Sequence, residues 1–515
     1  MPSGNALSSR PVRPPHFTRP ARHDVPPKGP FRSSGWIFEP RSLEIARGNA
    51  LPHVGAALAF VLGMRNAAFA LATMVSVLSS FAFGCSGSAE ETESLEEDVG
   101  DALAANDTFT PAAKRLWDAY VTETTKDVRL QPGCAPLRVP AIDPTTRRVL
   151  RRPKGVVVLF HGYTACPQQF MNFDRTVNGR TETVGLAAQL SRAGYEVLLP
   201  LLPGHGRAPQ PNPAWRGGSA PLPDPAVNKW PVIDDASAVP APLTSGDQLE
   251  GSPYTKLVRQ MNAVVAEIPD SANRVVGGIS VGGALATHAT LLATNKPYTR
   301  SLVAAPFYQA NQGQLNVIRV AAESLSQSAD ATTRAAVLDS VNKLSVDPGV
   351  FTKLAQTKIW ERLGEVPLGW GGECEIAERT TAGRAGICQF QVRHLAGALV
   401  YGKLVQDSLA GLARLPTKVQ MTGVVDDPVV SNAEVFKVAK RIADVTGASR
   451  TSLCVYENAS HSMFSWRDSS PSKEWIPPLE ASAVAFLTNS AEPARFFARK
   501  GPVVDKAGPV EGCKQ

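Results

Sequence analysis

The residues best suited to chemistry in this sequence lie in the segment "VVGGISVGG". Ser280 stands at the centre of the pattern Gly278-Ile279-Ser280-Val281-Gly282. A serine hydroxyl is a poor nucleophile near neutral pH until a neighbouring base removes its proton. A sharp turn from a strand into a helix presents such a hydroxyl, and small residues two positions before and after it allow close backbone packing. The pattern therefore makes Ser280 a candidate nucleophile, and an ordinary small-residue turn is the alternative interpretation.

The base that Ser280 needs is sought among the eight histidines of the chain, three of which lie within residues 1–63. His288 falls two turns along the helix expected after Ser280, so we interpret it as a packing residue. His394 lies in a region that we expect to be inserted and helical. His461, in "ENASHSMF", follows an expected strand and occupies a loop of small polar residues. We therefore predict that His461 is the base.

The acid is expected after a strand that lies between the serine and the histidine in the sequence. The segment "GVVDDPVVSN" supplies Asp426 and Asp427 at such a position. A carboxylate there would fix the imidazole tautomer and stabilise the cation that forms during attack. Asp426 lies three residues past Gly423, which is the commoner spacing for such an acid after its strand, and it is favoured. Asp427 is the competing candidate. Both could instead be surface carboxylates that cap the following helix.

An oxyanion site is also needed, because attack on a carbonyl places negative charge on its oxygen. The segment "LFHGYTACPQQF" follows a strong expected strand, and one backbone N–H should come from its turn. We expect Tyr163 to supply it, with Thr164 as the neighbouring alternative. His161 and Gly162 would shape the turn. Val281, directly after the serine, would supply the second N–H.

Strand-like and helix-like segments alternate through the region that carries these residues. The run "GVVVLF" at 155–160 is typical of a strand buried on both faces. Further strands are expected at 195–202, 273–279, 300–307, 417–424 and 451–457, and helices at 184–194, 252–268, 281–293 and 431–443. Such alternation predicts an α/β fold with a mostly parallel central sheet flanked by helices. A proline-rich stretch at 203–242 and an inserted cap at about 308–414 would interrupt it.

The net charge of +7 first suggests an anionic partner. Residues 1–84, however, hold nine of the 53 Lys and Arg residues and only three of the 46 Asp and Glu residues. The remaining chain is close to neutral. The charge distribution therefore gives no case for nucleic-acid binding.

The amino-terminal residues have the composition of a targeting region. Residues 1–63 are expected to be a disordered leader, or a mis-assigned start with translation beginning at Met64. Residues 64–84 have the pattern of a secretory signal peptide: one early arginine, an uncharged apolar run and then small residues. The small residues before Cys85 resemble the lipobox of bacterial lipoproteins. The acidic segment 85–110 is expected to be a solvated tether. We therefore predict an exported protein, either a cell-envelope lipoprotein anchored through Cys85 in the periplasm or on the outer surface, or a secreted one.

Six further cysteines would be oxidised in such a compartment. The pairs expected are Cys374 with Cys388, which would close a short loop, Cys134 with Cys166, and Cys454 with Cys513. No cysteine or histidine spacing suggests a metal site.

Five motifs in order, "FHGYTACPQQF", "LLPGHGRAP", "GISVGGALA", "GVVDDPVVS" and "NASHSM", resemble those of the α/β-hydrolase fold superfamily over about residues 150–490. The closest resemblance is to its bacterial serine esterases and its monoacylglycerol-lipase-like or lysophospholipase-like members. It implies an α/β-hydrolase domain at 111–515 and a serine hydrolase that forms an acyl-enzyme intermediate and needs no cofactor. By the same resemblance Ser280, Asp426 and His461 would be the nucleophile, acid and base, and His205 a structural loop residue.

The leading hypothesis is therefore a carboxylic-ester hydrolase that acts on a small acyl ester. An amide or peptide hydrolase with the same residues, similar to aminopeptidase-like relatives, is a second hypothesis. A catalytically silent surface-binding protein is a third, disfavoured because every expected element of the site is present. The sequence indicates neither the natural substrate nor the oligomeric state.

Overall fold

The computed structural model describes residues 108–489 with gaps, the longest of which are 208–232, 235–246, 370–388 and 466–474. The leader, signal and nearly all of the acidic tether expected at the amino end lie outside these described residues and stay predictions. Within the described part, no helix is long and apolar enough to cross a membrane.

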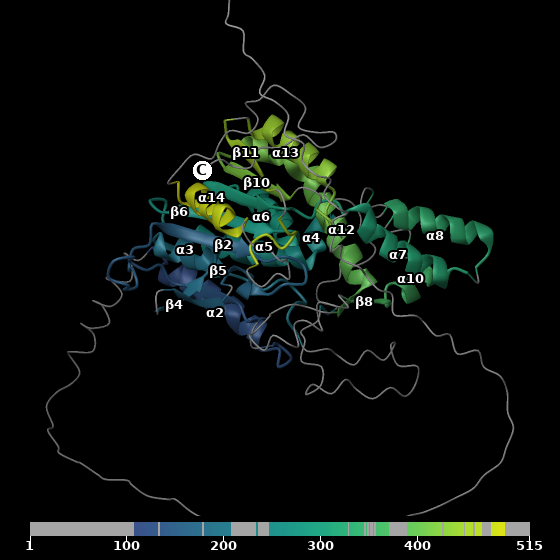
Figure 1. The fold of residues 1–515 in the computed structure, drawn as a ribbon, viewed down its shortest axis with the longest axis horizontal. Coiled ribbons are helices and arrows are strands. Elements are labelled where there is room, and N and C mark those ends of the chain that lie inside the picture. The colour runs from purple at the N-terminus through teal and green to yellow at the C-terminus, as the bar shows by residue number, and fades with distance from the viewer. Residues whose placement is uncertain are drawn as a thin grey trace, which may run out of the picture. The chain divides into compact units, whose positions relative to one another are not determined.

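A seven-stranded sheet forms the centre of the described part (Figure 1). Its strands, in spatial order, are β1 (Leu137–Val139), β5 (Tyr195–Leu199), β2 (Gly155–Phe160), β6 (Asn273–Ile279), β7 (Arg300–Ala304), β10 (Lys418–Val424) and β11 (Thr451–Tyr456). Only β1, at one edge, runs antiparallel to its neighbour, and the others pair in parallel. The prediction of a mostly parallel sheet is confirmed, and each expected strand is present with its ends shifted by three residues or fewer.

Strand β2 is apolar throughout because it is covered on both faces. Along β2, Val156 and Val158 belong to one buried core while Val157 and Leu159 belong to the other. Each core is closed by helices that flank the sheet (Figure 1). The first core contains buried residues of α2 (Pro111–Thr125), α5 (Pro253–Ala266), α6 (Val281–Leu292), α12 (Val392–Asp407) and α13 (Asn432–Thr446), and the second those of α3 (Leu186–Arg192) and α14 (Ile476–Thr488). This burial on both faces accounts for the continuous apolar runs in the sequence.

The segment expected to form an inserted cap lies between β7 and β10 and is mainly helical. Besides α12 it contains α7 (Gln312–Leu325), α8 (Ala331–Lys343), α10 (Lys358–Leu363), the hairpin of β8 (Pro367–Gly369) with β9 (Gln389–Gln391), and the 3-10 helix η5 (Ser408–Arg414). Its buried residues Leu315, Val337, Leu363 and Phe390 belong to the same core as α6. This segment therefore packs onto the main core through its own apolar residues. Its role as a cap over a substrate stays a prediction.

Several elements were not expected from the sequence. These are α2, the edge strand β1, the hairpin of β3 (Phe173–Val177) with β4 (Arg180–Val184), the short helices η2 (Pro167–Phe170) and α4 (Asp247–Gly251), and α14. Helix α2 begins at the capping residue Thr110 and buries Trp117 and Tyr120. The Tyr120 hydroxyl accepts a hydrogen bond from the Leu201 N–H at 2.9 Å and lies 3.1 Å from the Leu201 carbonyl oxygen. Helix α2 is thus joined directly to the segment that follows β5.

The expected disulfide between Cys134 and Cys166 is present, and both residues are fully buried. Cys454 also takes part in a disulfide, but its predicted partner Cys513 lies outside the described residues, so that pairing stays a prediction. The expected Cys374–Cys388 pair lies outside the described residues as well.

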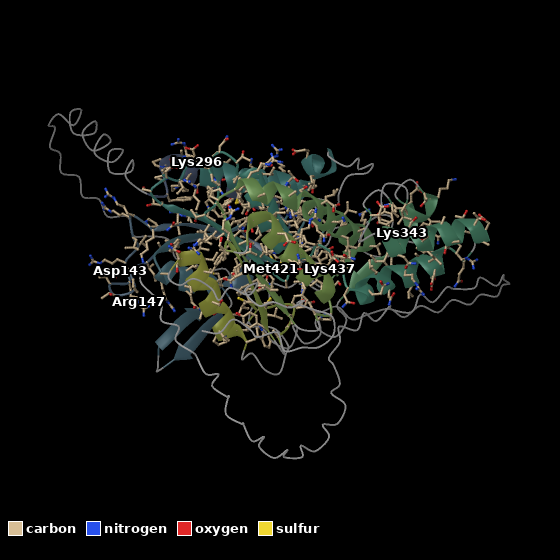
Figure 2. The ribbon with its side chains drawn as sticks, turned by 90° about the horizontal axis from the view of Figure 1, so that it is seen from above. Asp143, Arg147, Lys296, Lys343, Met421 and Lys437 are labelled. Atoms are coloured by element: carbon tan, nitrogen blue, oxygen red, sulfur yellow. A yellow bond between two sulfur atoms is a disulfide. The ribbon has the colours of Figure 1, made fainter. Side chains whose placement is uncertain are left out.

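Replacement of a core residue should show that the sheet depends on this two-sided burial. Met421 on β10 is fully buried and lies among the packed elements, whereas Lys343 and Lys437 are exposed (Figure 2). We expect Met421→Ala to lower the free energy of unfolding in urea by about 2–5 kcal/mol, because it leaves a cavity. As a control, Val320→Ala removes a side chain that is 51% exposed and should change the free energy of unfolding by less than about 0.5 kcal/mol. Equal effects of the two substitutions would contradict this assignment of the core.

Candidate active site

Ser280 occupies a sharp turn between β6 and α6. Its backbone has φ 58° and ψ −122°, a region that residues with side chains rarely adopt. A Cβ added at Gly278 would lie 2.0 Å from the Gly282 carbonyl oxygen, and one added at Gly282 would lie 2.1 Å from the Phe160 carbonyl oxygen. Both glycines are therefore required by close backbone contact, as the sequence pattern indicated.

His461 hydrogen-bonds to both Ser280 and a carboxylate. Its Nε2 atom lies 2.9 Å from the Ser280 Oγ, and its Nδ1 atom lies 2.8 Å from Oδ2 of Asp427. An ionised carboxylate only accepts hydrogen bonds, so the Nδ1 atom of His461 carries the ring proton. The Nε2 atom is then left to accept the serine proton. His461 comes from the segment after β11, and Asp427 from the segment after the neighbouring strand β10. The residues Ser280, His461 and Asp427 are 4%, 8% and 1% exposed, so water competes little for these hydrogen bonds.

The carboxylate that contacts His461 is therefore that of Asp427, and the preference for Asp426 does not hold for this contact. Asp426 lies outside the described residues. The Asp427 Oδ1 accepts hydrogen bonds from the Val429 and Val430 N–H groups at 2.8 and 3.0 Å. These bonds hold the carboxylate in a turn and aim its other oxygen at the imidazole. Asp427 was the alternative candidate in the sequence, and the spacing past Gly423 did not separate the two.

The segment after β2 also approaches Ser280 closely. A Cβ added at Gly162 would lie 3.6 Å from the Ser280 Cβ, so Tyr163 follows directly after a point of close approach. Val281 is the first residue of α6, and the first N–H groups of a helix have no partner within it. The N–H groups of Tyr163 and Val281, the expected oxyanion donors, thus belong to the two segments that meet beside the serine.

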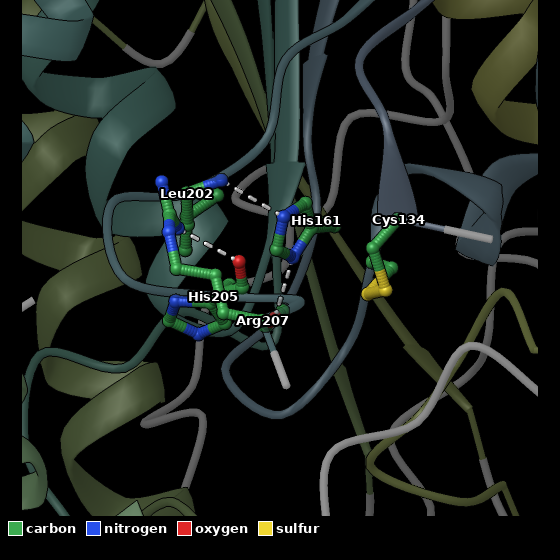
Figure 3. Close-up of a disulfide and its surroundings, with 7 residues drawn as sticks. Cys134, His161, Leu202, His205 and Arg207 are labelled. Carbon is green, nitrogen blue, oxygen red and sulfur yellow. Dashed lines mark hydrogen bonds between the residues drawn. A yellow bond between two sulfur atoms is a disulfide. The ribbon is translucent and has the colours of Figure 1, made fainter. Parts of the chain in front are cut away.

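His161 and His205 have structural surroundings. The His161 Nδ1 donates to the Gly162 carbonyl at 2.9 Å, and its Nε2 accepts from the Leu202 N–H at 3.0 Å. Burial lowers the pKa of His161 to about 4, so the ring is neutral. Burial, together with the nearby His161, lowers the pKa of His205 well below its ordinary value. Figure 3 shows both rings beside the disulfide of Cys134. His161 therefore ties the turn after β2 to the segment after β5.

His288 and His394 also lie away from the Ser280 hydroxyl contacts. The His288 Nδ1 lies 2.9 Å from the Tyr401 hydroxyl on α12, and burial lowers the pKa of His288 to about 4. His394 lies in the first turn of α12, where its Nδ1 accepts from the Gln391 N–H at 3.2 Å. The interpretation of His288 as a packing residue and the expectation that His394 is helical are both confirmed.

The arrangement supplies a hydroxyl beside an imidazole nitrogen that can accept its proton, together with two backbone segments that carry N–H groups, which suits nucleophilic attack on a carbonyl. Among the residues that the structure describes, no group of three His, Cys, Asp or Glu side chains could hold a metal ion. Sequence reasoning missed Gln169, whose side chain accepts a hydrogen bond from the Gly162 N–H. Its only signal was its place in the "PQQF" stretch after the turn.

Comparisons with known proteins give one family and several solved structures. The model of the "Alpha/beta hydrolase family" matches residues 157–476. No curated protein matches the chain.

Similar solved structures include a monoacylglycerol lipase of Paleococcus ferrophilus at 12% identity, with 69% of this chain and 98% of that chain covered and a TM-score of 0.37. A monoglyceride lipase variant of Saccharomyces cerevisiae matches at 13% identity, with 70% and 92% covered and a TM-score of 0.39. A carboxyl esterase of Bacillus coagulans matches at 12% identity, with 69% and 93% covered and a TM-score of 0.37.

Covalent labelling should distinguish the two aspartates. We expect Asp427→Asn to slow labelling of Ser280 by a fluorophosphonate by several orders of magnitude, on the order of 10⁴, because the amide favours the wrong imidazole tautomer. The matched change Asp426→Asn should leave the labelling rate within a few-fold of the unsubstituted protein. Mass spectrometry of the labelled peptide measures both rates. Slow labelling in Asp426→Asn alone would reverse the assignment.

The buried histidines should make the fold sensitive to acid. Because the pKa of His161 and of His288 is about 4 in the folded chain and near 6.5 when unfolded, protonation favours the unfolded state. The free energy of unfolding should have its full value above pH 6.5. It should fall as the pH decreases towards 4, by at most roughly 3 kcal/mol per histidine. Urea unfolding at several pH values measures this slope. His288→Gln should flatten it, and an unchanged slope would contradict the role of His288.

Proposed function

Because the chain belongs to the Alpha/beta hydrolase family, we propose that it is a serine hydrolase that cleaves carboxylic esters through an acyl-enzyme intermediate. The observation that carries this proposal is the position of His461, whose two ring nitrogens contact the Ser280 hydroxyl and the Asp427 carboxylate. In this proposal Ser280, His461 and Asp427 form the catalytic triad.

The first half of the reaction follows from these contacts. The Ser280 Oγ attacks the acyl carbonyl carbon while the His461 Nε2 takes the serine proton. The carbonyl oxygen becomes an oxyanion, which the Tyr163 and Val281 N–H groups stabilise. Asp427 keeps the Nδ1 proton in place and stabilises the imidazolium. Collapse of the tetrahedral intermediate breaks the bond to the alcohol, which leaves with the proton from Nε2, and the acyl group stays on Ser280.

The second half repeats these steps with water. His461 removes a proton from water, whose oxygen attacks the acyl carbon, and the same N–H groups hold the second oxyanion. The Ser280 oxygen then leaves with the proton from His461, and the carboxylic acid is released. No cofactor enters this sequence of steps.

The segment between β7 and β10 is proposed to cap the substrate, and the amino-terminal residues to export the protein and anchor it through Cys85. The disulfide between Cys134 and Cys166 supports an oxidising compartment.

Replacement of the serine tests the proposed function. Ser280→Ala should reduce hydrolysis of a short p-nitrophenyl ester by about 10⁶-fold in kcat, to the residual level left without the nucleophile. A far-ultraviolet circular dichroism spectrum unchanged from the unsubstituted protein controls for folding. Retained turnover in purified Ser280→Ala protein would rule the role out. A parallel panel of aminoacyl amides decides between esters and the amide alternative.

A further inference from the structure

The turn after β2 contains a strained residue. The Ala165 N–H donates to the Gly162 carbonyl at 3.1 Å, which closes a four-residue turn with Tyr163 and Thr164 at its centre. Thr164 has φ 67°, and Tyr163 is not among the residues with positive φ. This is the pattern of a type II turn, whose third position favours glycine. A β-branched residue there is under strain, so neighbouring groups must hold the turn in this shape.

One such group is the side chain of Gln169. Its Oε1 accepts a hydrogen bond from the Gly162 N–H at 2.9 Å. Gln169 belongs to η2, which is fixed by the buried ring of Phe170 against that of Phe464, with ring centres 5.9 Å apart. This bond fixes the amino end of the turn and occupies the Gly162 N–H. The next N–H in the chain is that of Tyr163.

The second group is the Cys134–Cys166 disulfide, at the carboxyl end of the turn. Cys166 directly follows Ala165 and precedes η2, and its Cα lies 4.9 Å from that of Cys134. The Cys134 side is held in turn by the segment after β5 (Figure 3). The Gln131 N–H donates to the Gly206 carbonyl at 2.8 Å, and a Cβ added at Gly206 would lie 2.4 Å from the Cys134 Cβ.

We propose that Gln169 and the Cys134–Cys166 disulfide are positioning groups that hold the strained Gly162–Ala165 turn, and thereby aim the Tyr163 N–H at the oxyanion. This inference rests on the proposed function. If one of these two groups is removed, the turn relaxes towards a negative φ at Thr164. This change reorients the peptide groups of the turn and weakens the hydrogen bond from the Tyr163 N–H to the oxyanion. Complete loss of one oxyanion donor lowers kcat by about 10²–10³-fold, so a misaligned donor should give a partial loss.

Removal of the disulfide tests the inference in the full chain. We expect Cys134→Ser/Cys166→Ser to lower kcat for a short p-nitrophenyl ester by about tenfold or more, while KM stays within about twofold, because the donor acts mainly in the transition state. Paired substitution is used because a reductant would also act on Cys454. Full retention of kcat in this variant would overturn the inference.

A rescue separates positioning from general stability. Glycine adopts positive φ without strain, so a glycine at the third position should keep the turn in shape without the disulfide. Addition of Thr164→Gly to Cys134→Ser/Cys166→Ser should therefore restore most of kcat. A loss of kcat that Thr164→Gly does not reverse would mean that the disulfide acts only on overall stability, against the inference.

A second pair of variants tests the inference if the paired cysteine variant does not fold. Gln169→Met should lower kcat with little change in KM, because a thioether is a weak acceptor for the Gly162 N–H. The matched control Gln168→Met, in the same short helix, should leave kcat within about twofold of the unsubstituted protein. Equal losses in the two variants would contradict a positioning role for Gln169.

Amide hydrogen exchange provides a readout that does not need turnover. Gln169→Met should speed exchange in the peptide that contains Gly162 and Tyr163, whereas Gln168→Met should not. If the unsubstituted protein hydrolyses no ester, the proposed function fails, and this exchange comparison alone decides whether the turn is held as inferred. Exchange that Gln169→Met leaves unchanged would overturn the inference.

Discussion

The contact between the first turn of α6 and the end of β2 determines the geometry of the whole site. Gly282 lies so close to the Phe160 carbonyl that no side chain fits between them. The same turn forces Ser280 to a positive φ. One backbone contact thus sets the distance between the serine hydroxyl and the turn after β2. His461 and Asp427 then need only follow the adjacent strands β11 and β10, because parallel neighbours end at the same edge of the sheet.

Much of this fold was predictable because its strands are buried on both faces. The apolar runs of β2 and β6 indicate their strands to the residue, since nearly every residue in the two strands is buried. The edge strand β1 has three partly or fully exposed residues and exists through its pairing with β5, which no local pattern shows. Helix α2 is a different case. The spacing of its buried residues Ala113, Trp117 and Tyr120 is a helical signal that lies outside the alternation of strands and helices.

The contact of the candidate site was predictable where one motif offered one candidate, as for Ser280 and His461. Two adjacent aspartates posed a harder problem, because neighbouring side chains in an extended segment point in opposite directions. The choice of Asp427 depends on its turn with Val429 and Val430, a contact that sequence spacing does not encode. For Gln169 the sequence offered only its place in the "PQQF" stretch, since its contact with Gly162 exists only once η2 is packed beside the turn.

The link between α2 and the segment after β5 limits how far the chain can be shortened from its amino end. The Tyr120 hydroxyl is the buried partner of the Leu201 N–H. A recombinant fragment, or a proteolytic product, that begins at β1 would lack this hydroxyl and leave that N–H buried without its acceptor, at a cost of about 1–3 kcal/mol. Fragments intended for crystallisation should therefore start ahead of Thr108, whose hydroxyl is bonded to the Pro153 carbonyl at 2.8 Å.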